Sequence, residues 1–240
     1  RQGGGLTATA LVAVARLGGR AAYAGVLGDD DLSRDAVAGL AAEGVDCSLV
    51  LRQPGAGPIH ARVIVDRSTG GRCILANRTR CVQRPDAAIT PDLLRQARVL
   101  FVDSTASESG LRGAQVAREI GMPVVGDIEH SHQAAAVALL AAIDHCIVGE
   151  EVAAAATGCT NPAEAALALG ARGYACAVVT AGARGAWYRL AGGPVRHQPA
   201  FDVAVVDTTG CGDVFHGVYA LCLARGLPLP EAIRLASAAS

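Results

Sequence analysis

The residues with the clearest chemical potential lie near the C-terminal end, in the segment Asp207-Thr208-Thr209-Gly210-Cys211-Gly212-Asp213. The pattern predicts a strand that ends in Asp207, a tight turn, and an amphipathic helix that begins near Asp213. Gly210 and Gly212 allow the backbone to turn sharply and to approach a ligand closely. Because the first-turn N–H groups of a helix point outward together and the helix dipole adds to them, this turn is a predicted anion-binding site.

An aspartate inside an anion-binding turn has two interpretations, and the spacing alone favours neither. As a helix cap, Asp213 would stabilise the helix by about 1 kcal/mol. As a catalyst, Asp213 would take a proton from a hydroxyl group while the N–H groups of the turn hold the charge of a phosphoryl group.

The chain contains no lysine, since all 21 of its basic residues are arginine. A P-loop lysine, a protein-kinase strand lysine and a Schiff-base lysine are therefore excluded from these 240 residues. Phosphoryl transfer by this chain would rely on positioning and on the electrostatics of the backbone.

Three motifs occur in a fixed order along the chain. The first runs from Gly4-Gly5 through Arg16-Leu17-Gly18 to Gly28-Asp29-Asp30, the second is Val179–Gly185, and the third is Asp207–Asp213. Together they resemble the signatures of the ribokinase-like (PfkB) carbohydrate kinases, and the resemblance covers essentially the whole chain. The second motif alone would be a weak signal, whereas all three in family order form a specific one.

The resemblance implies ATP-dependent phosphorylation of a hydroxyl on a sugar or sugar derivative, with Asp213 as the general base. The backbone of Gly210, Cys211 and Gly212 would hold the transferring phosphoryl group. The remaining implied contacts are Thr180, Gly182, Gly185 and Thr208 with the nucleotide, and Gly4, Gly5 and Thr9 with the sugar. Cys211 stands where the family usually has alanine, and we expect catalysis to survive because the contribution there is a backbone N–H.

The resemblance also implies Mg²⁺ with ATP, and K⁺ near Asp207 and Thr209. The family's N-x-x-E motif falls at Gly149-Glu150-Glu151-Val152, where neither the asparagine nor the final glutamate matches. Glu150 is a candidate to bind metal-bound water from a shifted position. A solvated acid in the first turn of a helix is an equally good interpretation of Glu150.

Within the family, the chain is most similar to the sulfofructose kinases, in particular at Gly28–Asp31 and His197–Phe201. A sulfonate requires a positive, planar donor, which arginine provides best. Arg62, Arg78 and Arg80 are the candidates near the predicted lid. The sugar itself is not identified by these residues.

Short apolar runs alternate with helical segments after Pro91, and this alternation predicts the elements that position the motifs. The predicted strands are Val99–Asp103, Pro123–Asp127, Cys146–Val148 and Ala175–Thr180, followed by a hairpin of Ala186–Leu190 and Val195–Gln198. The predicted helices are Glu108–Ile120, Gln133–Ala142, Glu150–Ala156, Pro162–Leu169, Asp213–Arg225 and Leu229–Ala239.

The expected fold class is α/β: a ribokinase-like, doubly wound, mostly parallel sheet flanked by helices, with a small antiparallel β lid. We expect one kinase domain over residues 1–240, with lid strands at approximately 45–80. Before Pro91 we predict a buried strand at Ala21–Leu27, a helix at Ser33–Ala42 capped by Ser33, and an antiparallel meander in the lid. The strands of this meander are predicted at Val45–Leu51, Ile59–Asp66 and Arg72–Ala76. Both termini are expected to be incomplete relative to the family.

Asp127 and Glu129 end a predicted parallel strand, where ligands collect in open α/β sheets. His216, in the last predicted helix, is interpreted as a packing or supporting residue. His130 and His132 form a loop pair without metal-ligand spacing.

The composition narrows the choice of partners. The formal net charge is −1, so no basic excess exists to neutralise nucleic-acid phosphates, and no apolar run reaches the ~18 residues that a membrane span needs. The eight cysteines are scattered without a C-x-x-C pair, which favours reduced thiols in a cytoplasmic protein.

The resemblance implies a sugar substrate, ATP and a second copy of the chain as partners. Pairing through the lid would also cover strand edges that are otherwise unpaired. Two alternatives stay open: a nucleoside kinase of the same fold, and a non-catalytic protein that senses sugars or nucleotides. A dehydrogenase would need G-x-G-x-x-G directly after a strand, which the glycine clusters do not provide.

Overall fold

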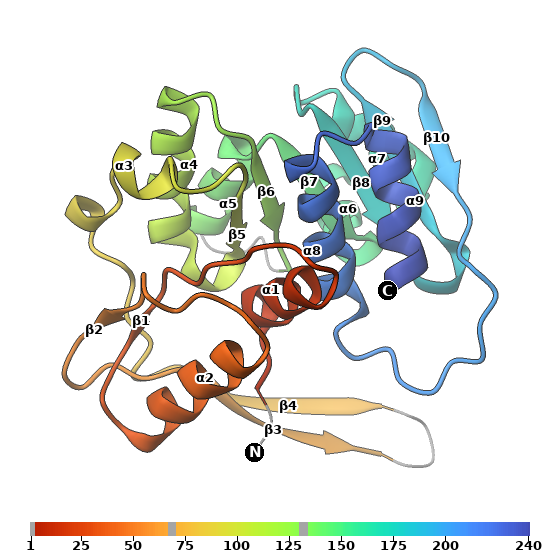
Figure 1. Cartoon of the computed structure of the whole chain (residues 1–240). Coiled ribbons are helices and arrows are strands. Elements are labelled where there is room, and N and C mark those ends of the chain that lie inside the picture. Colours follow the sequence, from red (N-terminus) through yellow and green to blue (C-terminus); the bar gives the residue numbers. More distant parts are fainter. Residues whose placement is uncertain (1–2, 67–70, 130–133) are drawn as a thin grey trace.

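The centre of the molecule is a six-stranded sheet with the order β10-β9-β8-β7-β6-β5 (Figure 1). The computed structural model describes residues 3–66, 71–129 and 134–240. Strands β5 to β8 are parallel, and β9 and β10 add an antiparallel edge. The strands are β5 Leu100–Asp103, β6 Val124–Asp127, β7 His145–Gly149, β8 Cys176–Thr180, β9 Ala186–Leu190 and β10 Val195–Gln198.

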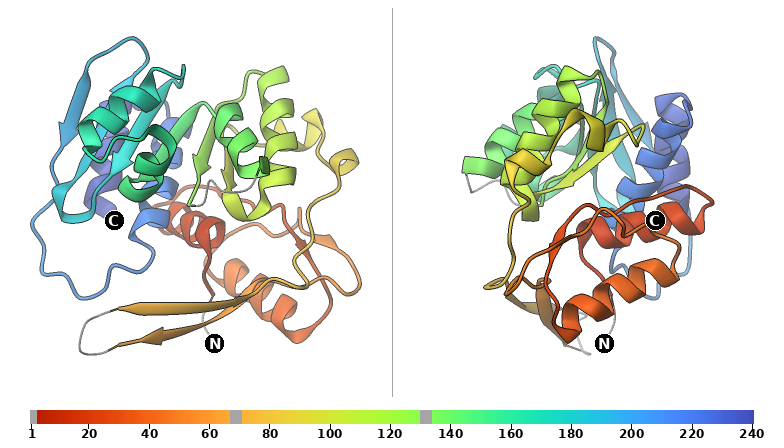
Figure 2. Two further views of the ribbon diagram at one scale, coloured as in Figure 1. Left: turned by 180° about the vertical axis from the view of Figure 1, so that it is seen from behind. Right: turned by 60° about the vertical axis from the view of Figure 1, so that its left-hand side comes forward.

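The central strands are buried on both faces, as their continuous apolar runs require. Alternate residues enter different cores: Cys146 and Val148 face one cluster, and Ile147 faces the other. Figure 2 shows a helical layer on each side of the sheet. One layer contains α3 Pro91–Leu94, α4 Ser107–Glu119, α5 Ala134–Ala142, α6 Glu150–Thr157 and α7 Pro162–Gly170; the other contains α1 Leu6–Arg16, α8 Cys211–Ala224 and α9 Leu229–Ala239.

Helix α8 is buried on nearly all sides between Phe215 and Cys222, because it lies between the sheet and helices α1 and α9. Gly217 is the point of closest approach: a Cβ there would lie 2.4 Å from the carbonyl oxygen of Ala10. The absence of a side chain at Gly217 therefore lets α1 pack directly on α8. This contact fixes the first turn of α1 beside the first turn of α8.

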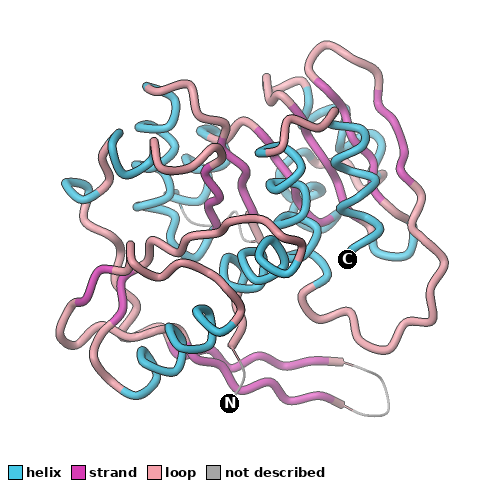
Figure 3. The backbone as a smooth tube through the Cα atoms, in the orientation of Figure 1, coloured by secondary structure: helices cyan, strands magenta, loops and turns pink. Residues whose placement is uncertain are grey.

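The lid differs from the predicted meander. Strands β1 Val26–Leu27 and β2 Leu51–Arg52 form a small parallel pair, and β3 His60–Val65 and β4 Arg72–Asn77 form a separate antiparallel hairpin (Figure 3). The prediction of a hairpin was right for β3 and β4. The prediction for Val45–Leu51 was wrong, because this segment pairs with the chain before helix α2 Asp31–Ala42 rather than with β3.

Two local predictions before the lid were also wrong. Within Ala21–Leu27, only Val26–Leu27 forms a strand, and Ala22 makes an isolated bridge. Helix α2 begins at Asp31 and is capped by Asp30, whose side chain accepts a hydrogen bond from Ser33 N. Ser33 is fully buried, and its hydroxyl group accepts a hydrogen bond from Gly28 N. Ser33 therefore stabilises the turn before the helix and does not cap the helix.

The strand predicted to end in Asp207 is absent from the described structure. Residues 199–210 form a loop that runs outside the sheet from β10 to α8 (Figure 1). Val205 and Val206 are β-branched and favour strands, but they pair with no strand of the described structure and are 68% and 98% exposed.

The predicted helices and strands after Pro91 otherwise agree with the structure within one or two residues. The start of α5 at Gln133 and the loop pair His130 and His132 lie outside the described residues. Among the helices described, none is long and apolar enough to cross a membrane.

Candidate active site

The candidate site lies where the carboxyl ends of the parallel strands meet the first turns of α1 and α8. Asp103 ends β5 and pairs in register with Asp127, which ends β6. Gly149 and Thr180 are paired in the same way at the ends of β7 and β8. The topology thus gathers chemically active residues from distant parts of the sequence at one edge of the sheet.

The turn before α8 is built on Gly210, the N-cap residue, which has φ 81° and ψ 0°. This left-handed conformation costs other residues more than it costs glycine. A Cβ at this position would also lie 3.3 Å from Cγ2 of Thr9. No side chain caps the helix, and Asp213 is its third residue. The capping interpretation of Asp213 is therefore wrong, which leaves its carboxylate available for another task.

Asp213 is half-buried, and its surroundings raise the pKa of its carboxyl group to about 7. Burial is the largest cause, followed by the negative charges of Asp127 and Glu129. A hydrogen bond from the Thr9 side chain and the proximity of His216 act in the opposite direction. The carboxyl group can therefore accept and release a proton near neutral pH, as a general base requires.

The first turn of α1 supplies hydroxyl groups to the same region. Thr9 hydrogen-bonds Asp213, and the Thr7 hydroxyl donates to Asp103. Asp103 also accepts hydrogen bonds from the backbone of Thr105 and Ala106, so its orientation is fixed. Thr7 and Asp103 are not among the residues predicted for the site, although Asp103 ends a predicted parallel strand, where ligands collect.

Gly4 and Gly5 are exposed at the start of α1, and a Cβ at either position would meet no atom within 4 Å. They leave the backbone open beside Thr7 and Thr9. The structure thus brings the three predicted sugar contacts, Gly4, Gly5 and Thr9, to the N-terminal turn of one helix.

The predicted nucleotide contacts follow β8. The Thr180 hydroxyl lies 3.4 Å from the Val148 carbonyl oxygen, and Gly182 is exposed with open space where a Cβ would be. Gly185 has a different environment, because a Cβ there would lie 2.2 Å from the Gln198 carbonyl oxygen. Packing against the end of β10 therefore explains Gly185. Thr208 is exposed, and its carbonyl oxygen accepts a 3.3 Å hydrogen bond from Cys211 N.

The predicted ion ligands do not form one cluster. Glu150 makes an ion pair with Arg184, which follows β8. Asp207 accepts a 2.8 Å hydrogen bond from Thr209 N. Within residues 3–66, 71–129 and 134–240, no group of three or more metal-ligating side chains occurs. Mg²⁺ usually binds through one or two carboxylates plus substrate phosphates, so it does not need a cluster of protein ligands. The separate carboxylates of Glu150 and Asp207 therefore still fit a nucleotide-bound Mg²⁺.

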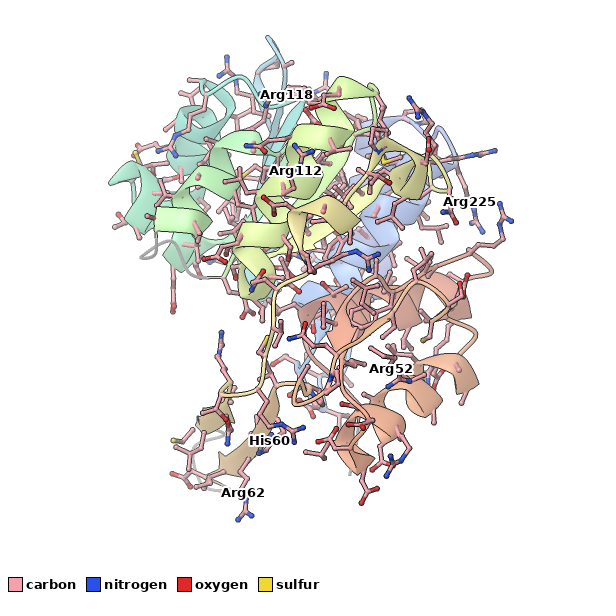
Figure 4. The ribbon with its side chains drawn as sticks, turned by 90° about the vertical axis from the view of Figure 1, so that its left-hand side faces the viewer. Arg52, His60, Arg62, Arg112, Arg118 and Arg225 are labelled. Atoms are coloured by element: carbon pink, nitrogen blue, oxygen red, sulfur yellow. The ribbon has the colours of Figure 1, made fainter. Side chains whose placement is uncertain are left out.

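The arginines predicted to bind a sulfonate differ in their position and in the hydrogen bonds that they already make. Arg80 lies at the base of the lid, where it pairs with Asp30 and donates to the carbonyl oxygens of Gly55 and Ala56. Arg62 is the third residue of β3 and lies on the lid hairpin, away from the main sheet (Figure 4). Arg80 therefore positions the lid, and these three contacts already use part of its hydrogen-bonding capacity.

The chain is similar in sequence to known proteins over most of its length. The family model described as "pfkB family carbohydrate kinase" matches residues 1–240. Aminoimidazole riboside kinase of Salmonella typhimurium is 31% identical over 243 residues, which cover 92% of this chain and 74% of that protein.

Solved structures give the same result. An Agrobacterium tumefaciens protein assigned to the ribokinases has a TM-score of 0.90 at 32% identity, covering 98% of this chain and 77% of that one. Aminoimidazole riboside kinase of Salmonella enterica, complexed with aminoimidazole riboside and an ATP analogue, has a TM-score of 0.83 at 28% identity, with 98% and 83% covered.

Proposed function

Because this chain belongs to the PfkB family of carbohydrate kinases, we propose that Asp213 is the general base with which it phosphorylates its sugar or nucleoside. The activity is ATP-dependent. The observation that carries the proposal is the Asp213 carboxyl group, with a pKa raised to about 7, in the first turn of a helix that no side chain caps.

The chemical step follows from this arrangement. The Asp213 carboxylate takes the proton of the acceptor hydroxyl as its oxygen attacks the γ-phosphorus of ATP. The bond from that phosphorus to the bridging oxygen breaks, and ADP leaves. The N–H groups of the Gly210–Asp213 turn stabilise the charge on the transferring phosphoryl group, and Thr9 orients the carboxylate through its hydrogen bond.

The acceptor would bind between the start of α1 and Asp213, against Gly4, Gly5 and Thr9. The aminoimidazole riboside kinases at 31% and 28% identity support a five-membered sugar ring, either free or as a riboside. A sulfonated sugar stays a prediction from the sequence, with part of the hydrogen-bonding capacity of Arg80 already used elsewhere.

Thr180 and Gly182 would contact the nucleotide, and Glu150 would help to hold the Mg²⁺ that is bound to its phosphates. Asp207 and Thr209 would hold K⁺ at the turn. Mg²⁺ would neutralise charge on the β- and γ-phosphates.

The test is ADP release with MgATP over a panel of ribose, fructose, ribosides, phosphorylated sugars and sulfonated sugars. We expect release that depends on one acceptor class, most strongly a furanose sugar or a riboside. Acceptor-independent ATP hydrolysis alone would contradict the proposal. Tight ligand binding without any ADP release would instead favour the sugar-sensing alternative.

The raised pKa of Asp213 predicts the pH dependence of the reaction. The base must be ionised, so kcat/KM for the acceptor should rise with pH through about 7 and level off above it. For this measurement, ATP is held saturating and the acceptor concentration is varied at each pH between about 5.5 and 9, roughly 1.5 to 2 units on either side of the pKa. A profile that is flat from pH 5.5 upward would contradict an Asp213 pKa near 7.

The lid supports a proposal of dimer formation. Its hairpin exposes five large apolar side chains: Val63, Ile64, Val65, Ile74 and Leu75, each more than half exposed. Val63 and Ile74 are paired across the two strands, and Val65 lies on the same face of the hairpin, so these three side chains form an apolar surface that is exposed to water. We propose that a second copy of the chain covers this surface.

Ile74→Glu should convert this dimer to a monomer, because a charge would be buried in the apolar contact. Light scattering at micromolar concentration measures the mass. Leu167→Glu is the matched control, since Leu167 is 51% exposed on α7, outside the lid, and the control should keep the parent mass. A monomeric parent protein would overturn the proposal.

A further inference from the structure

His216 lies beneath the Asp213 turn, one helical turn further along α8, and it is 5% exposed. Its Nδ1 is 2.7 Å from the carbonyl oxygen of Gly212, and its Nε2 is 3.0 Å from the carbonyl oxygen of Ile147 in β7. The ring thus connects the catalytic turn with the central strand of the sheet. Phe101 and Phe215 approach the ring with edge-on geometry.

The two contacts determine how many protons the ring carries. A carbonyl oxygen accepts hydrogen bonds and cannot donate them, and a neutral imidazole carries a single N–H group. Either neutral tautomer would place one nitrogen lone pair against a carbonyl lone pair. Only the doubly protonated imidazolium satisfies both Gly212 and Ile147.

A buried cation needs a negative partner, and the structure provides one. Oδ2 of Asp127 lies 3.6 Å from Nδ1 of His216, and both side chains are 6% exposed. Burial raises the pKa of Asp127, and the positive charge of His216 opposes that rise. The other acidic groups that act on Asp127 are Glu129 and Asp103, and on Asp213 they are Asp127 and Glu129.

We propose that His216 is held as a doubly protonated imidazolium. Its hydrogen bond to the Gly212 carbonyl oxygen positions Asp213, and its positive charge offsets the negative charge of Asp127, which keeps the Asp213 carboxyl group ionisable. The proposal rests on the role of Asp213 given above, but its proton count is independent of that role. His216 acts through the turn and through Asp127, so it is a positioning residue that does not touch the substrate.

His145 is a second buried histidine in this fold, and its hydrogen-bond partner can be compared with those of His216. It is 4% exposed on β7, and its Nδ1 lies 2.8 Å from the hydroxyl of Tyr219, which can donate as well as accept. A neutral ring is satisfied there, and burial lowers the pKa of His145. The two buried histidines should therefore differ in charge at the same pH.

The first test is ¹⁵N NMR of the full chain labelled at histidine, at pH 7, with His216→Asn used to assign the signals. We expect two protonated ring nitrogens for His216 and one for His145. A single protonated nitrogen at His216 would overturn the proposal. This readout does not depend on catalysis, so it distinguishes failure of this inference from failure of the role of Asp213.

The second test is the pH profile of kcat/KM. His216→Asn keeps a donor for the Gly212 carbonyl and removes the charge, so the rising limb should move about one pH unit higher, since a nearby opposite charge shifts a carboxylate pKa by that order. Asp127→Asn combined with His216→Asn should move the limb back toward the parent position. His216→Leu, which removes the donor as well, should lower kcat up to about a hundredfold, the cost typical of a 1 Å misplacement.

His145→Asn is the control for loss of a buried histidine, and it should leave the limb where it is in the parent. A purely structural role for His216 would lower the melting temperature and leave the limb in place, which would contradict the proposal.

Discussion

Asp213→Asn should lower kcat for acceptor phosphorylation about 10³-fold, with a small change in the acceptor KM. The amide is nearly isosteric with the carboxyl group, so the turn and the hydrogen-bonding reach to Thr9 remain. What is lost is the group that takes the hydroxyl proton, and general-base removal typically costs 10²- to 10⁴-fold. The measurement is steady-state ADP release with the acceptor found in the panel, above pH 8, where the parent carboxyl group is ionised.

The chain offers a matched control for this substitution. Glu231 is the third residue of α9, as Asp213 is the third residue of α8, and it is exposed. Glu231→Gln loses the same interaction with a helix dipole, worth about 0.3–1 kcal/mol, without touching the site. It should keep parental kcat. A loss below tenfold in Asp213→Asn would show that another group removes the proton.

Gly210→Ala should lower kcat about 10²- to 10³-fold, the range typical for loss of one anion-hole donor. The left-handed backbone at Gly210 is strained for alanine, and the added Cβ would lie 3.3 Å from Cγ2 of Thr9. The turn therefore has to rearrange, which misdirects its N–H groups. Steady-state kinetics with the same acceptor measure the effect.

Gly158→Ala separates backbone strain from the function of the turn. Gly158 ends α6 with φ 76°, and a Cβ there would meet no atom within 4 Å. This control should lose stability similar to that of Gly210→Ala and keep parental kcat. Equal kcat values in the two variants would contradict the role of the turn.

The parallel half of the fold could be predicted because each of its elements carries its own signal. The runs Val124–Asp127 and Cys176–Thr180 are continuous and apolar, as strands buried on both faces must be. The helices between them have caps such as Asn161 and stops such as Gly158. These local signals agree with the tertiary structure, so the boundaries agree within one or two residues.

The lid and the segment before Asp207 could not be predicted in the same way. Val205 and Val206 have high β-propensity, but propensity does not provide a neighbouring strand. Strands β1 and β2 have two residues each, too short for an alternating pattern to identify their pairing. Their pairing depends on contacts between segments that lie far apart in the sequence.

The motifs of the candidate site and the supporting position of His216 could be read from the sequence, but the contacts that join them could not. Asp213, Gly210 and Thr9 belong to contiguous patterns, and the structure brings them together. Asp103 and the double contact of His216 arise only when β5, β7 and α8 are assembled. The predicted ion ligand Glu150 is paired with Arg184, a contact between the ends of two strands that no local pattern encodes.

Phosphoryl transfer followed by ³¹P NMR, in the parent and in Asp213→Asn, tests the central claim most directly. The account predicts that the parent, given MgATP and the acceptor, produces a phosphomonoester signal in equal amount with ADP. It predicts that Asp213→Asn forms this product about 10³-fold more slowly. Equal rates in the two proteins, or inorganic phosphate as the sole product in the parent, would contradict it.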